Sequence, residues 1–249
     1  MSASMPPAPS RHLMLEGTYN VRDIGGYRTR EGRTTRWRTL LRADSLHRVS
    51  PAAQAMLLEQ GIRTVLDLRR ADEHQLAPNV FADRPGVTYH QVSLLWDTPP
   101  ARGVQPRPLP DIYRMLLDER QAQMRQALEA LSTPTGLPAV VHCSAGKDRT
   151  GLVIALVLGL LDVPPETIIE DYALSAQYLA GPFVDELRQK AASRDIPWEW
   201  YQAQVTCYPA LMQTTLHYLD EHYGGPQGYA QAIGLSPAAC HQLRQVLLE

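Results

Sequence analysis

Residues 142–151 read His-Cys-Ser-Ala-Gly-Lys-Asp-Arg-Thr-Gly, and this stretch decides the fold class. It follows a short apolar run, 138–141, that is typical of a buried strand, and it leads into Leu152–Leu158, which is apolar on every side. Backbone N–H groups converge at the N-terminus of such a helix, where the helix dipole favours negative charge. The sequence therefore predicts an anion-binding loop over residues 143–149, called the anion loop below.

Cys143 begins the anion loop and Arg149 ends it, with five residues between them. A thiol at a helix N-terminus beside fixed positive charge is ionised at neutral pH. A guanidinium presents a planar fork that matches two phosphate oxygens. The combination places a nucleophile beneath a bound oxyanion and predicts a cysteine-dependent phosphatase. The alternative is a buried structural cysteine near an ordinary helix start.

At these residues the sequence resembles the protein tyrosine phosphatase superfamily, whose signature is His-Cys, five residues, Arg and then Ser or Thr. Gly146, Thr150 and the flanking strand and helix agree with it. Rhodanese-like sulfur transferases also place a cysteine in an anion loop, but their loop is shorter and lacks this pattern. The resemblance implies an α/β fold with a central, mostly parallel sheet flanked by helices, and extra helices after the anion loop.

Four further stretches, 20–27, 41–46, 61–69 and 171–175, resemble one bacterial branch of the superfamily. Its members carry Lys and Asp inside the loop and act on phosphotyrosine, often on phosphoserine and phosphothreonine, and in some cases on phosphoinositides. The resemblance covers most of residues 13–249. It implies a phosphoprotein or phosphoinositide substrate and no cofactor.

The composition limits the size of the core, the class of partner and the cellular compartment. The 249 residues are 44% hydrophobic, enough for one core, and the net charge of −2 does not suggest a nucleic-acid partner. Three widely spaced cysteines argue for a reducing compartment rather than a disulfide framework. The first ten residues lack the features of a signal peptide, and the longest apolar run is too short to cross a bilayer. We therefore expect a cytoplasmic protein with no integral membrane segment; its oligomeric state is left open.

The pattern along the chain predicts one phosphatase domain over 12–249, preceded by a mobile tail over 1–11. A hairpin is expected to turn at Glu31-Gly32, and a helix to start at Ser50-Pro51 and end at Gly61. Strands are expected over 62–68 and 87–92, a Pro-rich loop over 97–110, and a helix or helix pair over 112–131. Alternating strands and helices indicate a mostly parallel sheet covered on both faces.

Helices are also expected downstream of the anion loop. About 164–201 is predicted as a lid-like helical insertion, with a hinge at Gly181-Pro182. The aromatic cluster 197–201 either packs against the core, which we favour, or lines a substrate entrance. Further helices are expected at 209–223 and 229–233, and a last one is capped by Ser236.

The chemistry assigns roles within the anion loop. Cys143 is the expected nucleophile, and Arg149 with loop residues binds the phosphate oxygens. The binding residues are Ser144, Ala145, Gly146, Lys147 and Thr150. By resemblance to tensin-type lipid phosphatases, Lys147 adds a second cation over the phosphate. The Thr150 hydroxyl is expected to donate to the sulfur or to cap the helix.

The general acid has more than one candidate. Tyrosine phosphatases usually place an Asp some tens of residues before the nucleophile, which here points to Asp97 or Asp111. The branch that this chain resembles instead offers Asp148 inside the loop. We prefer Asp148 over Asp97, and the competing role for Asp148 is a salt bridge that holds the loop.

Four residues are expected to support the site. His142 is predicted to orient the nucleophile rather than to carry the main proton. Asp23, Asp67 and Arg69 lie at loop or strand ends, where they either brace the anion loop or touch substrate. The other histidines lack ligand-like spacing, so no metal site is predicted.

Two rivals to a phosphatase use the same loop. One is a phosphoester-binding module without catalysis, although such relatives usually lose Cys or Arg. The other is a sulfur- or arsenate-handling enzyme, for which no second redox cysteine is obvious. Cys207 and Cys240 are expected to be ordinary buried thiols, with a resolving role for oxidised Cys143 left open.

Overall fold

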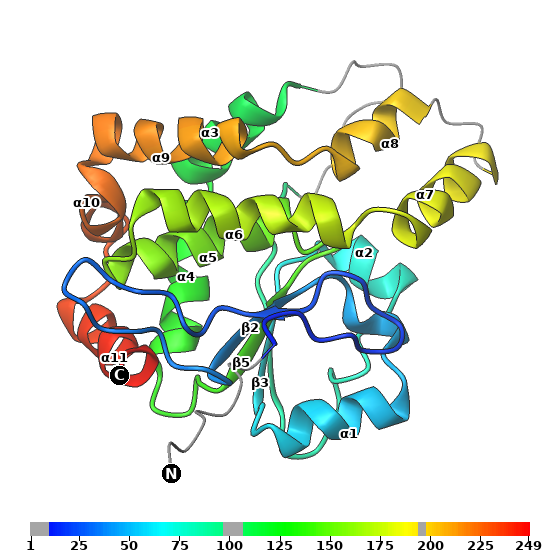
Figure 1. Cartoon of the computed structure of the whole chain (residues 1–249), viewed down its shortest axis with the longest axis horizontal. Coiled ribbons are helices and arrows are strands. Elements are labelled where there is room, and N and C mark those ends of the chain that lie inside the picture. The colour runs from blue at the N-terminus through cyan, green and yellow to red at the C-terminus, as the bar shows by residue number, and fades with distance from the viewer. Residues whose placement is uncertain (1–9, 97–106, 194–197) are drawn as a thin grey trace, which may run out of the picture.

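The computed structural model describes residues 10–96, 107–193 and 198–249, and its centre is a five-stranded sheet in the order β1-β2-β5-β3-β4 (Figure 1). The strands are β1 (Arg22–Asp23), β2 (Leu40–Ala43), β3 (Thr64–Asp67), β4 (Thr88–Gln91) and β5 (Ala139–His142). Strands β2, β5, β3 and β4 are parallel, and β1 pairs antiparallel with β2. The predicted, mostly parallel sheet is confirmed.

The register of the sheet brings the carboxyl ends of three strands to the same level. His142, the last residue of β5, pairs with Ala43 of β2 and with Asp67 of β3. The carboxyl ends of these parallel strands therefore lie at one edge, where open α/β sheets bind their ligands. The anion loop leaves the sheet at this edge, between the segments that follow β2 and β3.

Side chains alternate between two cores, as the pleat of a strand requires. In β5, Ala139 and Val141 pack into the larger core, whereas Val140 packs into a smaller one with Leu57 of α1 (Pro51–Glu59). The larger core surrounds α5 (Asp148–Leu160), which is buried along almost its whole length. Both faces of the sheet are therefore covered (Figure 1).

The remaining helices follow the predicted order, with two short unpredicted elements added over 46–48 and 71–76. They are the 3₁₀ turn η1 (Leu46–Arg48), α2 (Ala71–Leu76), α3 (Leu109–Glu119), α4 (Gln121–Ser132), α6 (Pro165–Tyr178), α7 (Pro182–Ser193), α8 (Trp198–Val205), α9 (Pro209–Tyr223), α10 (Gly225–Ala232) and α11 (Pro237–Leu247). Ser50 and Ser236 cap α1 and α11 through their hydroxyl oxygens. None of the described helices is long and apolar enough to span a bilayer.

Two expectations are refined. The hairpin turns where predicted, with the Thr29 N–H donating to the Arg33 carbonyl at 2.8 Å. Arg11 belongs to the predicted mobile tail but is anchored, because it donates to the Asp23 carbonyl at 2.6 Å and its guanidinium carbon lies 3.8 Å from the Tyr27 ring centroid. Residues 1–9 of that tail lie outside the described residues.

The aromatic cluster does not join either large core. Tyr201 of α8 is buried against Leu187 and Ala191 of α7, and Trp198 packs on the same group. Helices α7 and α8 thus share a small core of their own and lie at one end of the molecule, above α2 (Figure 1).

Candidate active site

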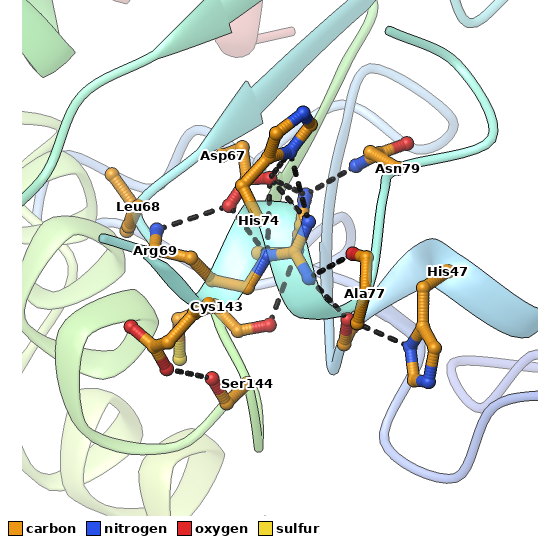
Figure 2. Close-up of polar contacts among 12 residues, drawn as sticks. His47, Asp67, Leu68, Arg69, His74, Ala77, Asn79, Cys143 and Ser144 are labelled. Carbon is orange, nitrogen blue, oxygen red and sulfur yellow. Dashed lines mark hydrogen bonds and ion pairs between the residues drawn. The ribbon is translucent and has the colours of Figure 1, made fainter. Parts of the chain in front are cut away.

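The nucleophile lies at the end of the central strand. Cys143 follows β5 directly and is 2% exposed. Helix α5 begins five residues later, so Arg149 is its second residue. Cys143 and Ser144 lie beside a polar cluster around Asp67 and Arg69 (Figure 2).

Three carbonyl groups of the anion loop, those of residues 145–147, accept hydrogen bonds from side chains outside the loop. Asn20 donates through Nδ2 to the Ala145 carbonyl at 2.9 Å. Arg42 donates to the carbonyls of Gly146 at 2.8 Å and Lys147 at 3.4 Å. A peptide is planar and trans, so each N–H points opposite to the preceding carbonyl. The N–H groups of residues 146–148 consequently face away from these donors and form an anion nest.

Gly146 allows the loop to bend this sharply. Its φ of +67° is in the left-handed region, and a Cβ there would lie 2.4 Å from the Ala43 carbonyl oxygen. The loop is therefore packed directly against the end of β2, and no larger residue fits at this position.

Glu73, from α2, holds the arginine of the loop. Its two carboxylate oxygens accept from Arg149 Nη1 at 2.6 Å and Nη2 at 2.9 Å, and one of them also accepts from the Ser144 hydroxyl. Burial would raise the pKa of Glu73, but the hydrogen bonds and charge of Arg149 outweigh it and lower the pKa to about 2. Glu73 is therefore ionised and fixes the guanidinium plane.

The terminal nitrogens of Arg149 are well occupied. Nη1 also donates to the Leu68 carbonyl at 3.3 Å and Nη2 to the Ser144 hydroxyl at 3.0 Å. Of the five N–H donors of the guanidinium, Nε–H is the one without an acceptor among the described residues. Nε–H is therefore the guanidinium donor that is left for a bound oxyanion.

His142 is buried and neutral. The Asn79 side-chain oxygen accepts from the Phe81 N–H, so its amide nitrogen faces His142 Nε2 at 2.8 Å. Nε2 therefore accepts, and Nδ1–H donates to the Cys143 carbonyl at 3.1 Å. Burial also lowers the pKa of His142. This geometry matches the predicted orienting role.

Asp67 and Arg69 form a brace beneath the loop. The Arg69 guanidinium donates to both Asp67 oxygens, at 2.7 Å for Nη2 to Oδ2, and to the Ser45 hydroxyl and the Ala77 carbonyl. Because the Ser45 N–H donates to the Ser144 carbonyl at 3.1 Å, the brace connects to the anion loop. Asp23 lies elsewhere, and accepts from the N–H groups of Gly25 and Arg38 at a turn.

The two central polar residues of the loop point to other elements. Lys147 is buried, and Nζ donates to the Thr206 carbonyl at 2.6 Å and lies 3.3 Å from Asp148 Oδ1. Asp148 Oδ1 accepts from the Tyr113 hydroxyl at 2.6 Å. The Asp148 side chain is 28% exposed, so it keeps access to the outside.

The other candidates are placed as follows. The Thr150 hydroxyl is buried and has no hydrogen-bond partner among the described residues, so the expected bond to sulfur is not formed here and remains a proposal for the reacting state. Asp111 is half exposed and lies 3.6 Å from Arg114. Asp97 lies outside the described residues.

Sequence reasoning assigned no role to several residues that build this site: Asn20, Arg42, Glu73, Tyr113 and Tyr172. Asn20, Arg42 and Tyr172 lie in stretches that carried the resemblance, which was the one signal pointing to them. Glu73 lies in a short polar helix without a distinguishing pattern. No group of three or more His, Cys, Asp or Glu side chains within the described ranges forms a metal site.

A family model described as the tyrosine phosphatase family matches residues 13–249. The chain belongs to the tyrosine phosphatase family. A tyrosine-protein phosphatase of Nostoc commune is 30% identical over 212 residues, covering 82% of this chain and 72% of its own. The triple specificity protein phosphatase PtpB of Mycobacterium tuberculosis is 28% identical and covers 94% of this chain and 98% of its own. The predicted enzyme class, a protein-tyrosine phosphatase, is confirmed at the level of the family.

Among solved structures, the core catalytic domain of the PP-IP phosphatase SIW14 from S. cerevisiae is 19% identical to this tyrosine phosphatase family member. It covers 63% of this chain and 88% of its own, with a TM-score of 0.33. The P. aeruginosa protein TpbA is also 19% identical, with a TM-score of 0.31. The family membership rests on the sequence matches alone.

Proposed function

We propose that the protein hydrolyses phosphomonoesters, phosphotyrosine foremost, through a phosphocysteine intermediate. The observation that carries this is the convergence of the buried Cys143, the anion nest and the Glu73-bound Arg149 at one strand end. A thiolate in such a nest faces the phosphorus of a bound ester, and the fixed donors stabilise the charge that develops on the equatorial oxygens.

The reaction has two balanced steps. In the first, the Cys143 sulfur forms a bond to phosphorus while the phosphorus–oxygen bond to the leaving group breaks, and Asp148 gives its proton to the departing oxygen. In the second, water attacks phosphorus, the sulfur–phosphorus bond breaks to regenerate the thiolate, and the Asp148 carboxylate takes the proton of the water. Asp148 is the proposed acid because it lies beside Arg149 and is partly exposed.

We further propose that the enzyme accepts phosphoserine, phosphothreonine and phosphoinositides. Two features support this wider range: the relative named as a triple specificity phosphatase, and the Lys147 ammonium in the loop. For Lys147 to meet a second phosphate, its contact with the Thr206 carbonyl has to be exchanged. Turnover of a panel of phosphopeptides and phosphoinositides measures the range, with a cytoplasmic phosphoprotein as the expected physiological class.

The mechanism is tested with p-nitrophenyl phosphate. The wild-type protein is expected to turn it over equally with and without EDTA. Cys143→Ser is expected to leave less than about 1% of kcat, because loss of such a nucleophile costs several orders of magnitude. The variant should still bind tungstate, since the nest survives. Cys240→Ser, which changes a thiol outside the site, is the control and should keep full activity.

Two outcomes would contradict the mechanism. One is residual activity in Cys143→Ser well above this level. The other is failure to recover a phosphate-labelled Cys143 peptide after acid quench of the wild-type enzyme. A protein that binds tungstate tightly but turns nothing over would instead support the phosphoester-binding alternative.

A further inference from the structure

Two tyrosines form a hydrogen-bonded chain that ends on the proposed acid. Tyr113 on α3 and Tyr172 on α6 are each 1% exposed, and their hydroxyl oxygens are 2.9 Å apart. The Tyr113 hydroxyl is 2.6 Å from Asp148 Oδ1. A carboxylate oxygen only accepts, so Tyr113 donates to Asp148, and Tyr172 consequently donates to Tyr113.

The hydrogen-bonded tyrosines occupy one carboxylate oxygen of Asp148 and leave the other one available. Oδ1 receives Tyr113 and also faces Lys147 Nζ at 3.3 Å. No hydrogen bond to Oδ2 is found among the described residues, and the Asp148 side chain is 28% exposed. A proton on Oδ1 would displace both donors, whereas a proton on Oδ2 displaces neither.

We propose that Tyr113 is a positioning residue for catalysis, backed by Tyr172, and that the chain keeps the acid proton on Asp148 Oδ2. This inference rests on the proposed role of Asp148 as the general acid. It gives α3 and α6 a role in positioning the acid, in addition to their role in the packed core. Each donor in such a chain strengthens the next, so loss of the outer tyrosine also weakens the inner bond.

Both hydroxyls stay protonated while the enzyme works. Burial raises the pKa of Tyr113 and of Tyr172 well above the usual tyrosine range. The Tyr172 ring lies against α5, where a Cβ on Gly151 would come within 3.0 Å of it. The chain is therefore held by packing at one end and by Asp148 at the other.

Other groups also face Asp148. Lys147 and Arg149 adjoin it in the loop, and both contribute positive charge. Cys207, which follows α8, interacts electrostatically with Asp148, but burial raises the pKa of its thiol and it stays neutral. The cationic neighbours are unchanged in a tyrosine variant, so a shift in the pH profile of that variant reports the tyrosine chain.

The test is the pH dependence of kcat/KM for phenyl phosphate and p-nitrophenyl phosphate. Tyr113→Phe removes a donor that favours the ionised form of the acid, so the acid keeps its proton to higher pH. The fall of kcat/KM at high pH, called the basic limb of the profile, is expected to move up by about 1 pH unit. The loss in kcat is expected to be about tenfold for phenyl phosphate and smaller for p-nitrophenyl phosphate, whose leaving group needs less protonation.

Two further variants complete the series. Tyr172→Phe is expected to move the limb in the same direction by a smaller amount. Tyr218→Phe is the matched control, because Tyr218 donates to Asp118 at 2.7 Å and so makes the same kind of bond between α9 and α3 away from the site. It should leave both the limb and kcat unchanged.

The outcomes distinguish the positioning role of Tyr113 from the proposed role of Asp148 as the general acid. Asp148→Asn should abolish the basic limb; if the limb persists, the assignment of Asp148 as acid is wrong. If Asp148→Asn abolishes the limb but Tyr113→Phe leaves it in place, the positioning role is overturned and the acid stands. An equal loss on both substrates in a folded Tyr113→Phe variant, without a shift, would also overturn it.

Discussion

At the scale of single residues, the Glu73 carboxylate determines the orientation of the Arg149 guanidinium. Glu73→Gln keeps the size of the side chain but removes the charge that pairs with Arg149. We expect kcat/KM to fall on the order of 10- to 100-fold, since misplacing a phosphate-binding group has that effect. Tungstate titration should show weaker oxyanion binding in the variant, and unchanged binding would contradict the role.

The same substitution has a pH signature in stability. The folded pKa of Glu73 is lowered to about 2 from 4.5, so its contribution is present above the unfolded value and is lost as pH falls through the folded one. Wild type should exceed Glu73→Gln in free energy of unfolding by about 2–3 kcal/mol at pH 7. Denaturant titrations should show the gap closing between pH 4.5 and 2; a gap that widens on acidification would contradict the ion pair.

At the scale of elements, the anion loop depends on its contact with the end of β2. Gly146→Ala would place a Cβ 2.4 Å from the Ala43 carbonyl, so the loop has to move and its N–H groups no longer converge. We expect kcat/KM to fall more than about 100-fold. Gly224→Ala is the matched control, because Gly224 has a similar φ of +76° with nothing within 4 Å of the added atom.

The control should lose only about 1–2 kcal/mol of stability through its left-handed backbone, with full activity. Kinetics and thermal unfolding of the two variants therefore separate backbone strain from the steric clash. Equal activities in the two variants would show that the loop has room to adapt.

The sequence predicted those elements whose signals are local. The strand before residue 143, the apolar α5 after the loop and the caps Ser50 and Ser236 are each encoded within a few residues, and all are confirmed. The role of Glu73 depends on Arg149, 76 residues away, and that of Tyr113 on Asp148, 35 residues away. A polar residue on a short helix carries no mark of its partner, so these contacts needed the fold.

At the scale of the whole molecule, the lid predicted over 164–201 is narrowed to α7 and α8, because α6 packs into the larger core through Ile168 and Tyr172. The small core of α7 and α8 is separate, and α7 is fastened to the body by Glu186, which accepts from Arg48 at 2.9 Å and from the Tyr19 hydroxyl. The Arg48 and Glu186 side chains are 44% and 42% exposed, and exposed pairs contribute at most about 1 kcal/mol. Opening should therefore be easy and sensitive to salt.

The role of the Glu186 contacts with Arg48 and Tyr19 is tested by limited proteolysis within 181–205. Glu186→Gln should speed nicking a few-fold at low salt, and added salt should bring wild type to the same rate while leaving the variant unchanged. Vanadate should protect wild type if the lid closes over an occupied site. Nicking that ignores both vanadate and the Glu186 substitution would remove the lid proposal.

The close contact of Gly151 with Tyr172 has a consequence for evolution. A side chain at 151 would push on the ring 3.0 Å away and so disturb the chain that ends on Asp148. The two positions should therefore co-vary among homologues: an aromatic residue at 172 should occur with glycine at 151, and a larger residue at 151 should be accompanied by a smaller one at 172. Lineages that have made this exchange would have inherited a differently supported acid, and their substrates should be biased toward esters with good leaving groups.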